Sequence, residues 1–516
     1  MVGVPKVQQS PRSFYKETNT KVTPEAIHIC DIEREVMQFN SFVFILLFLP
    51  MTILLYFGAN RLKFLWGKIV LIAASVIFYT YSGMKLATIL GMSLLMNFGV
   101  TLLIQKAKKP RIFFLTPIAV NIGLLLYFKY TNFFIGVMNQ HIGTSWALRE
   151  LIQPLGISFF TFQQIAYIVA VYKKEIDKVS ATDYLSYILF FPKILMGPLM
   201  DPVDFIHQLN DDSGKKENWD NIACGVKIFS FGLFKKVMIA DIFSKGVTWA
   251  FSNPGAATAA DWILVALFYT FEIYFDFSGY SDMAVGAAQM FNITLLINFD
   301  SPYKAISIRD FWKRWHISLT KFFTKYVYIP LGGSRKGAVL TCVNIMIVFL
   351  LSGFWHGANY TFILWGALHG LFMVADRVCE NIEKKIFEPL RWFLTFCVVN
   401  ALWLLFRAES IGQWKDIIKT ILKMQNTTIS DGLISCFRLP EVPFLEQTFH
   451  LGRVEGIRGF WLFLYVIAAM GICLVPDNNY KTRNRLSIGT MIVAAIAFTW
   501  GLICLSSESV FVYFDF

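Results

Sequence analysis

Residues 337–375 read GAVLTCVNIMIVFLLSGFWHGANYTFILWGALHGLFMVA, a run of 39 residues without Asp, Glu, Lys or Arg. Two membrane crossings need about 40 apolar residues, so this run has room for two helices and only a tight turn between them. The turn falls at Gly353–Asn359, at or below the membrane interface. Backbone outside a helix is tolerated at that depth only beside a cavity or other protein. The run therefore predicts a membrane hairpin with His356 lining a recess.

The composition extends this prediction to the whole chain. Of its 516 residues, 56% are hydrophobic and only 16% are charged, whereas average soluble domains are about a quarter charged. These values exclude a soluble globular enzyme, a disordered chain and a fibrous protein. We expect an all-α polytopic integral membrane protein with about 10–12 transmembrane helices and re-entrant segments.

The basic residues predict an orientation. The connections near residues 61–68, 106–111 and 173–178 are rich in Lys and Arg, and the connections between them are poor in both. The positive-inside rule places the three basic connections in the cytoplasm. The net charge of +12 is then explained by cytoplasmic loops that face anionic lipid headgroups, and we expect membrane lipid rather than nucleic acid as a partner.

The polarity of the chain divides it into two parts. Residues 1–36 are polar and predict a flexible N-terminal tail, or an extension before a native start at Met37, and residues 37–516 predict one transmembrane domain. Within that domain, residues 205–221 predict a surface loop and residues 409–458 an excursion along the membrane surface.

His356 is the strongest candidate for chemistry, because an ionisable residue within a membrane segment indicates a functional site. Neutral imidazole can accept the proton of a hydroxyl group as that group attacks a thioester, a reaction that needs no metal or ATP. The alternative is a hydrogen-bonded structural histidine. For His369, packing within a helix is the favoured interpretation.

The segment 304–336 carries eight basic residues against one acid, with aromatic residues between them. On one helix, Arg309, Trp312 and His316 would share a face. The segment predicts either an anchor in the headgroup region or a docking surface for a phosphate-bearing donor, such as coenzyme A or a phosphopantetheine carrier. In the second interpretation Arg309, Lys313 and Arg314 bind the donor.

Glu272 and Asp276 form a further cluster, four residues apart on one helix face. Such a pair could do acid–base work, but ion pairs that hold helices together are favoured. We expect Ser278–Gly279 to break this helix. The chain lacks the G-x-S-x-G, G-x-G-x-x-G and H-E-x-x-H motifs, and its eight cysteines include no C-x-x-C pair. We therefore expect no metal site and no bound cofactor.

Nine short motifs give the chain a resemblance to a known family. They are FKYTNFF at 128–134, PLGISFFTFQ at 154–163, FFPKILMGP at 190–198, GLFKK at 232–236, FDFSGYSD at 275–282, FWKRWHISL at 311–319, YIPLGG at 328–333, WHG at 355–357 and FRA at 406–408. In order and number they resemble the membrane-bound O-acyltransferase family, and most of all its bacterial alginate O-acetylation branch. The sequence departs from the branch pattern at Thr324-Lys325, where an Arg-Asp pair is expected, so an acid is missing there.

The resemblance implies a multi-helix fold around a core funnel, with His356 as the catalytic histidine and His316 as a second site histidine. It implies a multi-pass protein of the bacterial cytoplasmic membrane that moves an acetyl group from acetyl-CoA or an acyl carrier protein thioester across the membrane. An extracytoplasmic acetyltransferase partner would then place the group on a polysaccharide of the alginate type. The alternatives are D-alanyl transfer to teichoic acid from a carrier protein and, from another class, a membrane transporter. Transporters often carry inverted repeats, and no repeat is evident in this sequence.

Overall fold

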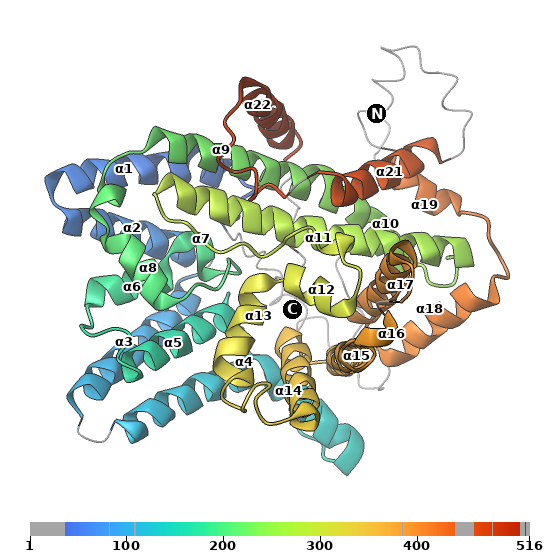
Figure 1. The fold of residues 1–516 in the computed structure, drawn as a ribbon, viewed down its shortest axis with the longest axis horizontal. Coiled ribbons are helices and arrows are strands. Elements are labelled where there is room, and N and C mark those ends of the chain that lie inside the picture. The colour runs from blue at the N-terminus through green and yellow to red at the C-terminus, as the bar shows by residue number, and fades with distance from the viewer. Residues whose placement is uncertain are drawn as a thin grey trace, which may run out of the picture. The chain divides into compact units, whose positions relative to one another are not determined.

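A computed structural model describes residues 37–505 and 511, apart from residues 82, 108–109, 384, 439–458 and 477. The tail predicted at residues 1–36 lies outside the described residues, and residues 37–516 form one compact unit. Every regular element in the described part is a helix (Figure 1).

The first half of the fold contains eleven numbered helices. They are α1 (Leu49–Leu62), α2 (Phe64–Thr80), α3 (Met84–Lys106), α4 (Arg111–Ile142), α5 (Ile157–Tyr172), α6 (Ala181–Leu189), α7 (Phe191–Ile194), α8 (Pro202–Asn210), α9 (Trp219–Phe234), α10 (Asp241–Ser252) and α11 (Ala259–Met290). The π-helical turns η2 (Val43–Phe48) and η4 (Lys235–Ala240) precede α1 and follow α9.

The second half begins with the short helices of the basic segment and continues with longer apolar ones. Its helices are α12 (Ile308–Arg314), α13 (Ile317–Phe323), α14 (Ala338–His356), α15 (Tyr360–Val378), α16 (Glu380–Glu383), α17 (Glu388–Arg407), α18 (Ile411–Lys423), α19 (Asp431–Ser435), α21 (Phe460–Leu474) and α22 (Ile488–Ile503).

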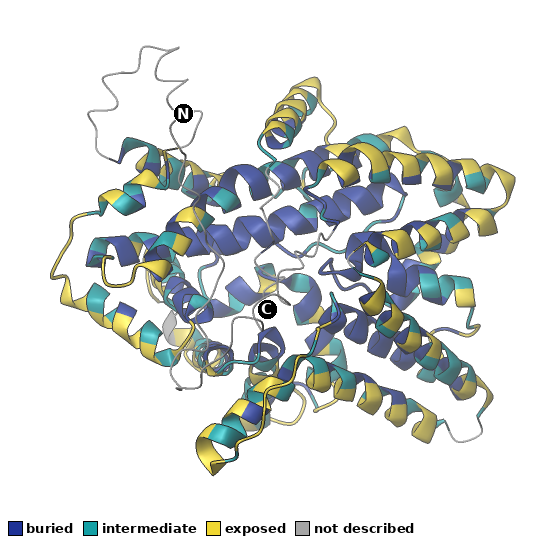
Figure 2. Ribbon diagram, turned by 180° about the vertical axis from the view of Figure 1, so that it is seen from behind, coloured by how far each residue is buried: buried dark blue, intermediate teal, exposed yellow. Residues whose placement is uncertain are grey.

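The apolar runs of the sequence form helices as predicted. Among the described residues, six helices are long and apolar enough to cross a membrane: Val43–Leu62, α3, α4, α14, α15 and α17. Four shorter apolar helices accompany them, namely α2, α5, α21 and α22. The protein is therefore an all-α, polytopic membrane protein, and the total of 10–12 crossings stays a prediction. Many outward residues of the peripheral helices are exposed and apolar (Figure 2), as expected of surfaces that contact lipid.

The predicted break at Ser278–Gly279 is wrong, because α11 is continuous from Ala259 to Met290. A Cβ atom on Gly279 would lie 2.8 Å from the carbonyl oxygen of Gly232 on α9. One on Gly286 would lie 2.6 Å from the carbonyl oxygen of Gly225. The glycines therefore let α9 and α11, which lie side by side in Figure 1, approach closely, as small residues do in membrane helix pairs.

The uncharged run 337–375 forms the predicted hairpin. Helices α14 and α15 are joined by residues 357–359 alone. They cross at a further pair of glycines: a Cβ atom on Gly353 would lie 2.3 Å from the carbonyl oxygen of Phe362, and one on Gly366 would lie 2.4 Å from that of Phe349. This close crossing fixes the end of α14, where His356 lies.

The surface stretches differ in part from the sequence predictions. The loop predicted at 205–221 is wrong at both ends, because α8, capped by Asp201, continues to Asn210 and α9 begins at Trp219. A proline at the first helical position and an aspartate cap are favourable helix-start signals. Within the excursion predicted at 409–458, the structure forms α18 and α19, and residues 439–458 lie outside the described residues.

Candidate active site

His356 is the last residue of α14 and is only 4% exposed. Aromatic rings surround its imidazole: the ring centroids of Trp355, Phe406 and Trp365 lie 4.9, 5.2 and 5.3 Å away. The predicted histidine therefore lies in an apolar, aromatic environment at the end of a membrane helix. Such an environment favours the neutral imidazole that a general base requires.

Two neighbouring residues of α4 hold the end of α14. Lys129 Nζ donates hydrogen bonds to the carbonyl oxygens of Trp355 at 2.7 Å and His356 at 2.9 Å. The Tyr130 hydroxyl donates to the carbonyl oxygen of Phe354. The last carbonyl groups of a helix have no partner within the helix, so these donors cap α14 at the position of His356. Neither role was predicted from the sequence, although a lysine within the apolar helix α4 indicates a specific partner.

His316 lies against the same indole as His356, although the two histidines are 40 residues apart in the sequence. The His316 ring centroid is 6.3 Å from that of Trp355 and 4.7 Å from that of Phe277. Both ring nitrogens are buried and have no hydrogen-bond partner within the described part of the chain. His316 lies outside the six long spans, and burial lowers the pKa of its imidazole to about 3, so the ring is neutral at physiological pH.

The predicted helix face that joins Arg309, Trp312 and His316 is wrong. Helix α12 ends at Arg314, Trp315 is extended, and His316 takes φ 45° and ψ 51°, in the left-handed region. A residue other than glycine in this region is uncommon and strained, and such residues gather at functional sites. The break turns His316 toward Trp355 and leaves Arg309 on a separate helix.

His369 has the packing role expected for it. Its ring is fully buried, and its Nδ1 accepts a hydrogen bond of 3.2 Å from Trp312 Nε1. The ring centroid of His369 lies 4.7 Å from that of Trp365, and Trp365 in turn contacts His356 at the end of α14.

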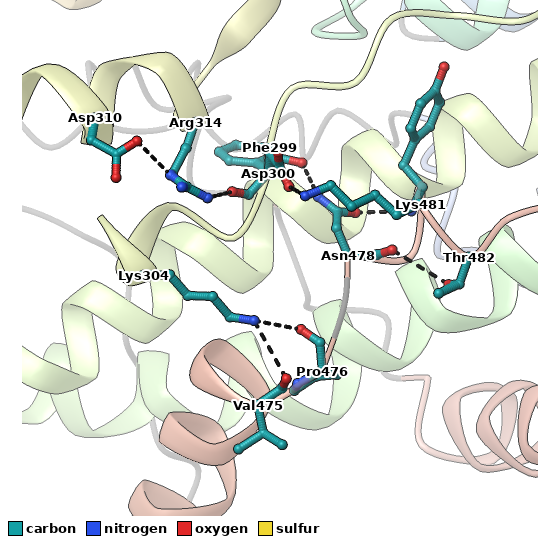
Figure 3. A network of polar contacts seen from close by, with 11 residues as sticks. Phe299, Asp300, Lys304, Asp310, Arg314, Val475, Pro476, Asn478, Lys481 and Thr482 are labelled. Atoms are coloured by element: carbon teal, nitrogen blue, oxygen red, sulfur yellow. Dashed lines mark hydrogen bonds and ion pairs between the residues drawn. The ribbon is translucent and has the colours of Figure 1, made fainter. Parts of the chain in front are cut away.

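Two of the three predicted donor-binding residues already have acidic partners. Arg309 forms ion pairs with Glu380 at 3.1 Å and Asp376 at 3.5 Å. Arg314 pairs with Asp310 at 2.9 Å and donates to the carbonyl oxygen of Asp300 at 3.3 Å (Figure 3).

Polar contacts also join residues 300–304 to the segment 475–482. Lys304 Nζ donates to the carbonyl oxygen of Pro476 at 3.0 Å, and Lys481 pairs with Asp300 at 2.9 Å (Figure 3). Lys313, in contrast, is exposed on α12. It is therefore the member of the predicted trio that is best placed to meet a donor.

Lys325, at the departure from the family pattern, has acidic partners from other elements. It pairs with Asp201 and, at 3.6 Å, with Glu175. Burial lowers the pKa of Lys325, but the hydrogen bond and charge of Asp201 and the charge of Glu175 outweigh it and raise the pKa above its ordinary value. The charge of Lys325 is thus neutralised by the N-cap residue of α8 and by a residue in the turn after α5.

Asp276 of the acidic cluster on α11 forms the ion pair that the sequence favours. Asp276 is fully buried and pairs with Lys236 of η4 at 2.7 Å, and Lys236 also pairs with Asp241 at 2.9 Å. This network joins η4, α10 and α11 in the core. Glu272, one turn earlier on α11, is also buried.

The family model for the membrane-bound O-acyltransferase family matches residues 71–411, a range that contains both site histidines and the basic segment. This chain belongs to the membrane-bound O-acyltransferase family. It is an acyltransferase, and the transporter alternative is set aside. Within the family match, His356 and His316 are the residues that the structure brings to one buried aromatic cluster.

Named relatives cover much of the chain. It is 34% identical to a peptidoglycan O-acetyltransferase of Helicobacter pylori over 93% of this chain and 98% of that protein. It is 36% identical to a probable alginate O-acetylase, AlgI, of Pseudomonas putida over 73% of this chain and 78% of that protein. A teichoic acid D-alanyltransferase of Streptococcus thermophilus is 26% identical over 52% of this chain and 71% of that protein.

Proposed function

We propose that this protein moves an acetyl group from a cytoplasmic thioester donor across the bacterial cytoplasmic membrane for O-acetylation of an extracytoplasmic glycan. The observation that carries the proposal is the arrangement of two buried histidines, His316 and His356, against the Trp355 ring in an aromatic environment. Thioester acyl transfer needs a base and a water-poor site, and this arrangement provides both.

In the proposed reaction, the hydroxyl oxygen of the acceptor attacks the carbonyl carbon of the thioester, and His356 accepts the hydroxyl proton. The carbon–sulfur bond then breaks, and the imidazolium returns the proton to the leaving thiolate. His316 is proposed to position the acyl group, since its ring nitrogens are buried and without a protein partner in the described part of the chain.

The contact with Lys129 relates the depth of His356 in the membrane to a position on α4. Lys129, which binds its carbonyl group, lies 18 residues after Arg111 and 13 before Ile142, or roughly 27 and 20 Å along the helix axis. With the basic connection 106–111 in the cytoplasm, the histidine lies within the bilayer and nearer its outer side. A cytoplasmic donor would reach it from one end and an extracytoplasmic acceptor from the other.

Peptidoglycan is the proposed glycan, because the match to the Helicobacter pylori peptidoglycan O-acetyltransferase extends over nearly the whole of both chains. The matches to AlgI proteins cover less of the chain and support an exported polysaccharide of the alginate type as the second substrate class. An extracytoplasmic acetyltransferase partner would complete the transfer to the glycan. The donor is either acetyl-CoA or an acyl carrier protein thioester.

The test compares glycans from cells that lack the protein with glycans from cells that express the wild type or His356→Ala. Mass spectrometry of muropeptides should show an added acetyl mass that is removed by mild base and that appears only with the wild type. An acetyl mass on exported polysaccharide alone would redirect the substrate to the alginate type. Release of D-alanine from teichoic acid, without acetate, would replace the proposal with the D-alanyl alternative.

A further inference from the structure

A groove of about 500 Å³ follows α1 on the side of the molecule where α9 and α22 also lie. Its wall is almost entirely apolar and extends from Ile45 past Ile53 and Leu54 to Gly58, with Phe498 contributed by α22. The volume falls within the range of small-molecule sites. None of its lining residues takes part in the histidine site.

The surroundings of the groove identify its occupant as a lipid chain. Helix α1 belongs to the candidate span Val43–Leu62, and Leu54 in the groove wall is 70% exposed, so the groove opens where hydrocarbon surrounds the protein. From Ile45 to Arg61 the helix rises roughly 24 Å, which is most of the 30 Å thickness of the hydrocarbon layer. The groove is therefore long enough to hold an extended fatty acyl chain.

Opposite charges lie at one end of this apolar groove. Arg61 and Glu217 form an ion pair, and both line the groove. The Arg61 side chain is 71% exposed and so remains accessible to a further partner. Trp219 beside them is 74% exposed, and tryptophan prefers the level of the lipid headgroups. This end of the groove thus has the polarity of the membrane interface.

We propose that the groove binds one zwitterionic phospholipid of the phosphatidylethanolamine type, with its phosphate at Arg61 and its ammonium group at Glu217. An arginine fork suits a phosphate group, and a carboxylate suits an ammonium group. An anionic phospholipid such as phosphatidylglycerol has no ammonium group to pair with Glu217. The proposal concerns a site apart from His356, and so it is independent of the proposed acyl transfer.

The first experiment uses native mass spectrometry of the whole protein extracted in detergent and offered equal amounts of phosphatidylethanolamine and phosphatidylglycerol. The wild type should retain one phosphatidylethanolamine with a preference of about tenfold, equivalent to 1.4 kcal/mol. Equal retention of the two lipids, or retention of neither, would overturn the proposal.

A blocking variant tests the place of binding. A Cβ atom on Gly58 would meet nothing within 4 Å, so Gly58→Phe should fill the groove without displacing the backbone. Gly99→Phe is the matched control, because Gly99 also lies in a membrane helix with open space around it and is not part of the groove. The blocked variant should lose at least about nine-tenths of the bound lipid, and the control should keep it. Equal retention by both variants, each monodisperse on gel filtration, would contradict the assignment.

A charge variant tests the headgroup. Glu217→Lys leaves two cations at the mouth of the groove and should reverse the preference from phosphatidylethanolamine to phosphatidylglycerol. Because Glu217 is on a surface connection before α9, the substitution leaves the apolar wall intact. An unchanged preference would show that Glu217 does not select the headgroup, and the zwitterionic assignment would fail.

Discussion

The histidine cluster at the end of α14 and the basic segment 304–336 both indicate function in the sequence, but their side chains have different neighbours in the structure. Around His356 the neighbours are aromatic rings and the helix end is capped by Lys129 and Tyr130. In the basic segment, Arg309 and Arg314 are bound to carboxylates. The His316 ring nitrogens thus have no partner in the described part of the chain, whereas both of these arginines are paired within the fold.

The difference has a physical origin. A charged group inside or beside a membrane is costly unless a partner compensates its charge. Cations there therefore pair with acidic residues from distant parts of the chain. A neutral imidazole has no such requirement and can remain without a partner at smaller cost. A surplus of basic residues in a membrane protein therefore indicates a binding surface only after its internal partners are known.

The largest expected effect comes from His356→Ala. Removal of the base should lower acyl transfer by about 10²–10⁴-fold, while the protein remains folded and inserted. The assay follows label from the thioester donor to the glycan in membranes that contain the partner. His207→Ala, at an exposed position on α8, should keep full activity. A fully active His356→Ala variant would remove the histidine from the reaction.

His316 is tested by a variant that removes the ring without changing the backbone. Glycine adopts positive φ freely, so His316→Gly keeps the turn and relieves its strain. We expect a loss of activity of about 10²-fold in a protein that still folds and inserts, with a lower thermal stability because the buried ring leaves a cavity. If His316→Gly is as active as the wild type, the ring has only a packing role and the functional comparison rests on His356 alone.

Lys129 is expected to act by positioning His356. Lys129→Met keeps most of the side-chain volume but removes the cap on the carbonyl groups of Trp355 and His356. A displaced histidine should lower kcat by about 10- to 100-fold and leave the KM for the donor unchanged.

Two further variants separate positioning from a general loss of stability. Lys129→Arg retains a donor and should restore part of kcat. Tyr130→Phe removes a single hydrogen bond to Phe354 and should cost about 1 kcal/mol of stability. A rise in KM with unchanged kcat in Lys129→Met would instead assign Lys129 to donor binding.

The elements of the fold were predictable to the extent that they depend on local sequence. Apolar runs predicted α14 and α15, and the predicted hairpin placed His356 within the membrane segment. The left-handed turn at His316 was not predictable, because the connection between α12 and α13 contains no proline or glycine that would indicate a turn. Gly279 was misinterpreted for a related reason: its role depends on contact with Gly232, 47 residues earlier in the sequence. Ion pairs such as Arg309 with Glu380 are equally non-local.

The smallest expected effect comes from Lys313→Glu, which tests whether the basic segment has any role in donor binding. Lys313 is exposed on α12, so the substitution reverses a charge without removing an internal ion pair, unlike a change at Arg314. If the donor carries phosphate groups to this surface, its KM should rise by roughly fivefold, corresponding to about 1 kcal/mol for an exposed pair. The increase should be greater at low salt, because exposed charges are then less screened. Lys415→Glu, at another exposed position on α18, provides the matched control and should leave the KM unchanged. Equal KM values for both variants at low salt would assign the basic segment to anchoring in the headgroup region, and the histidine cluster would then be the functional region of the two.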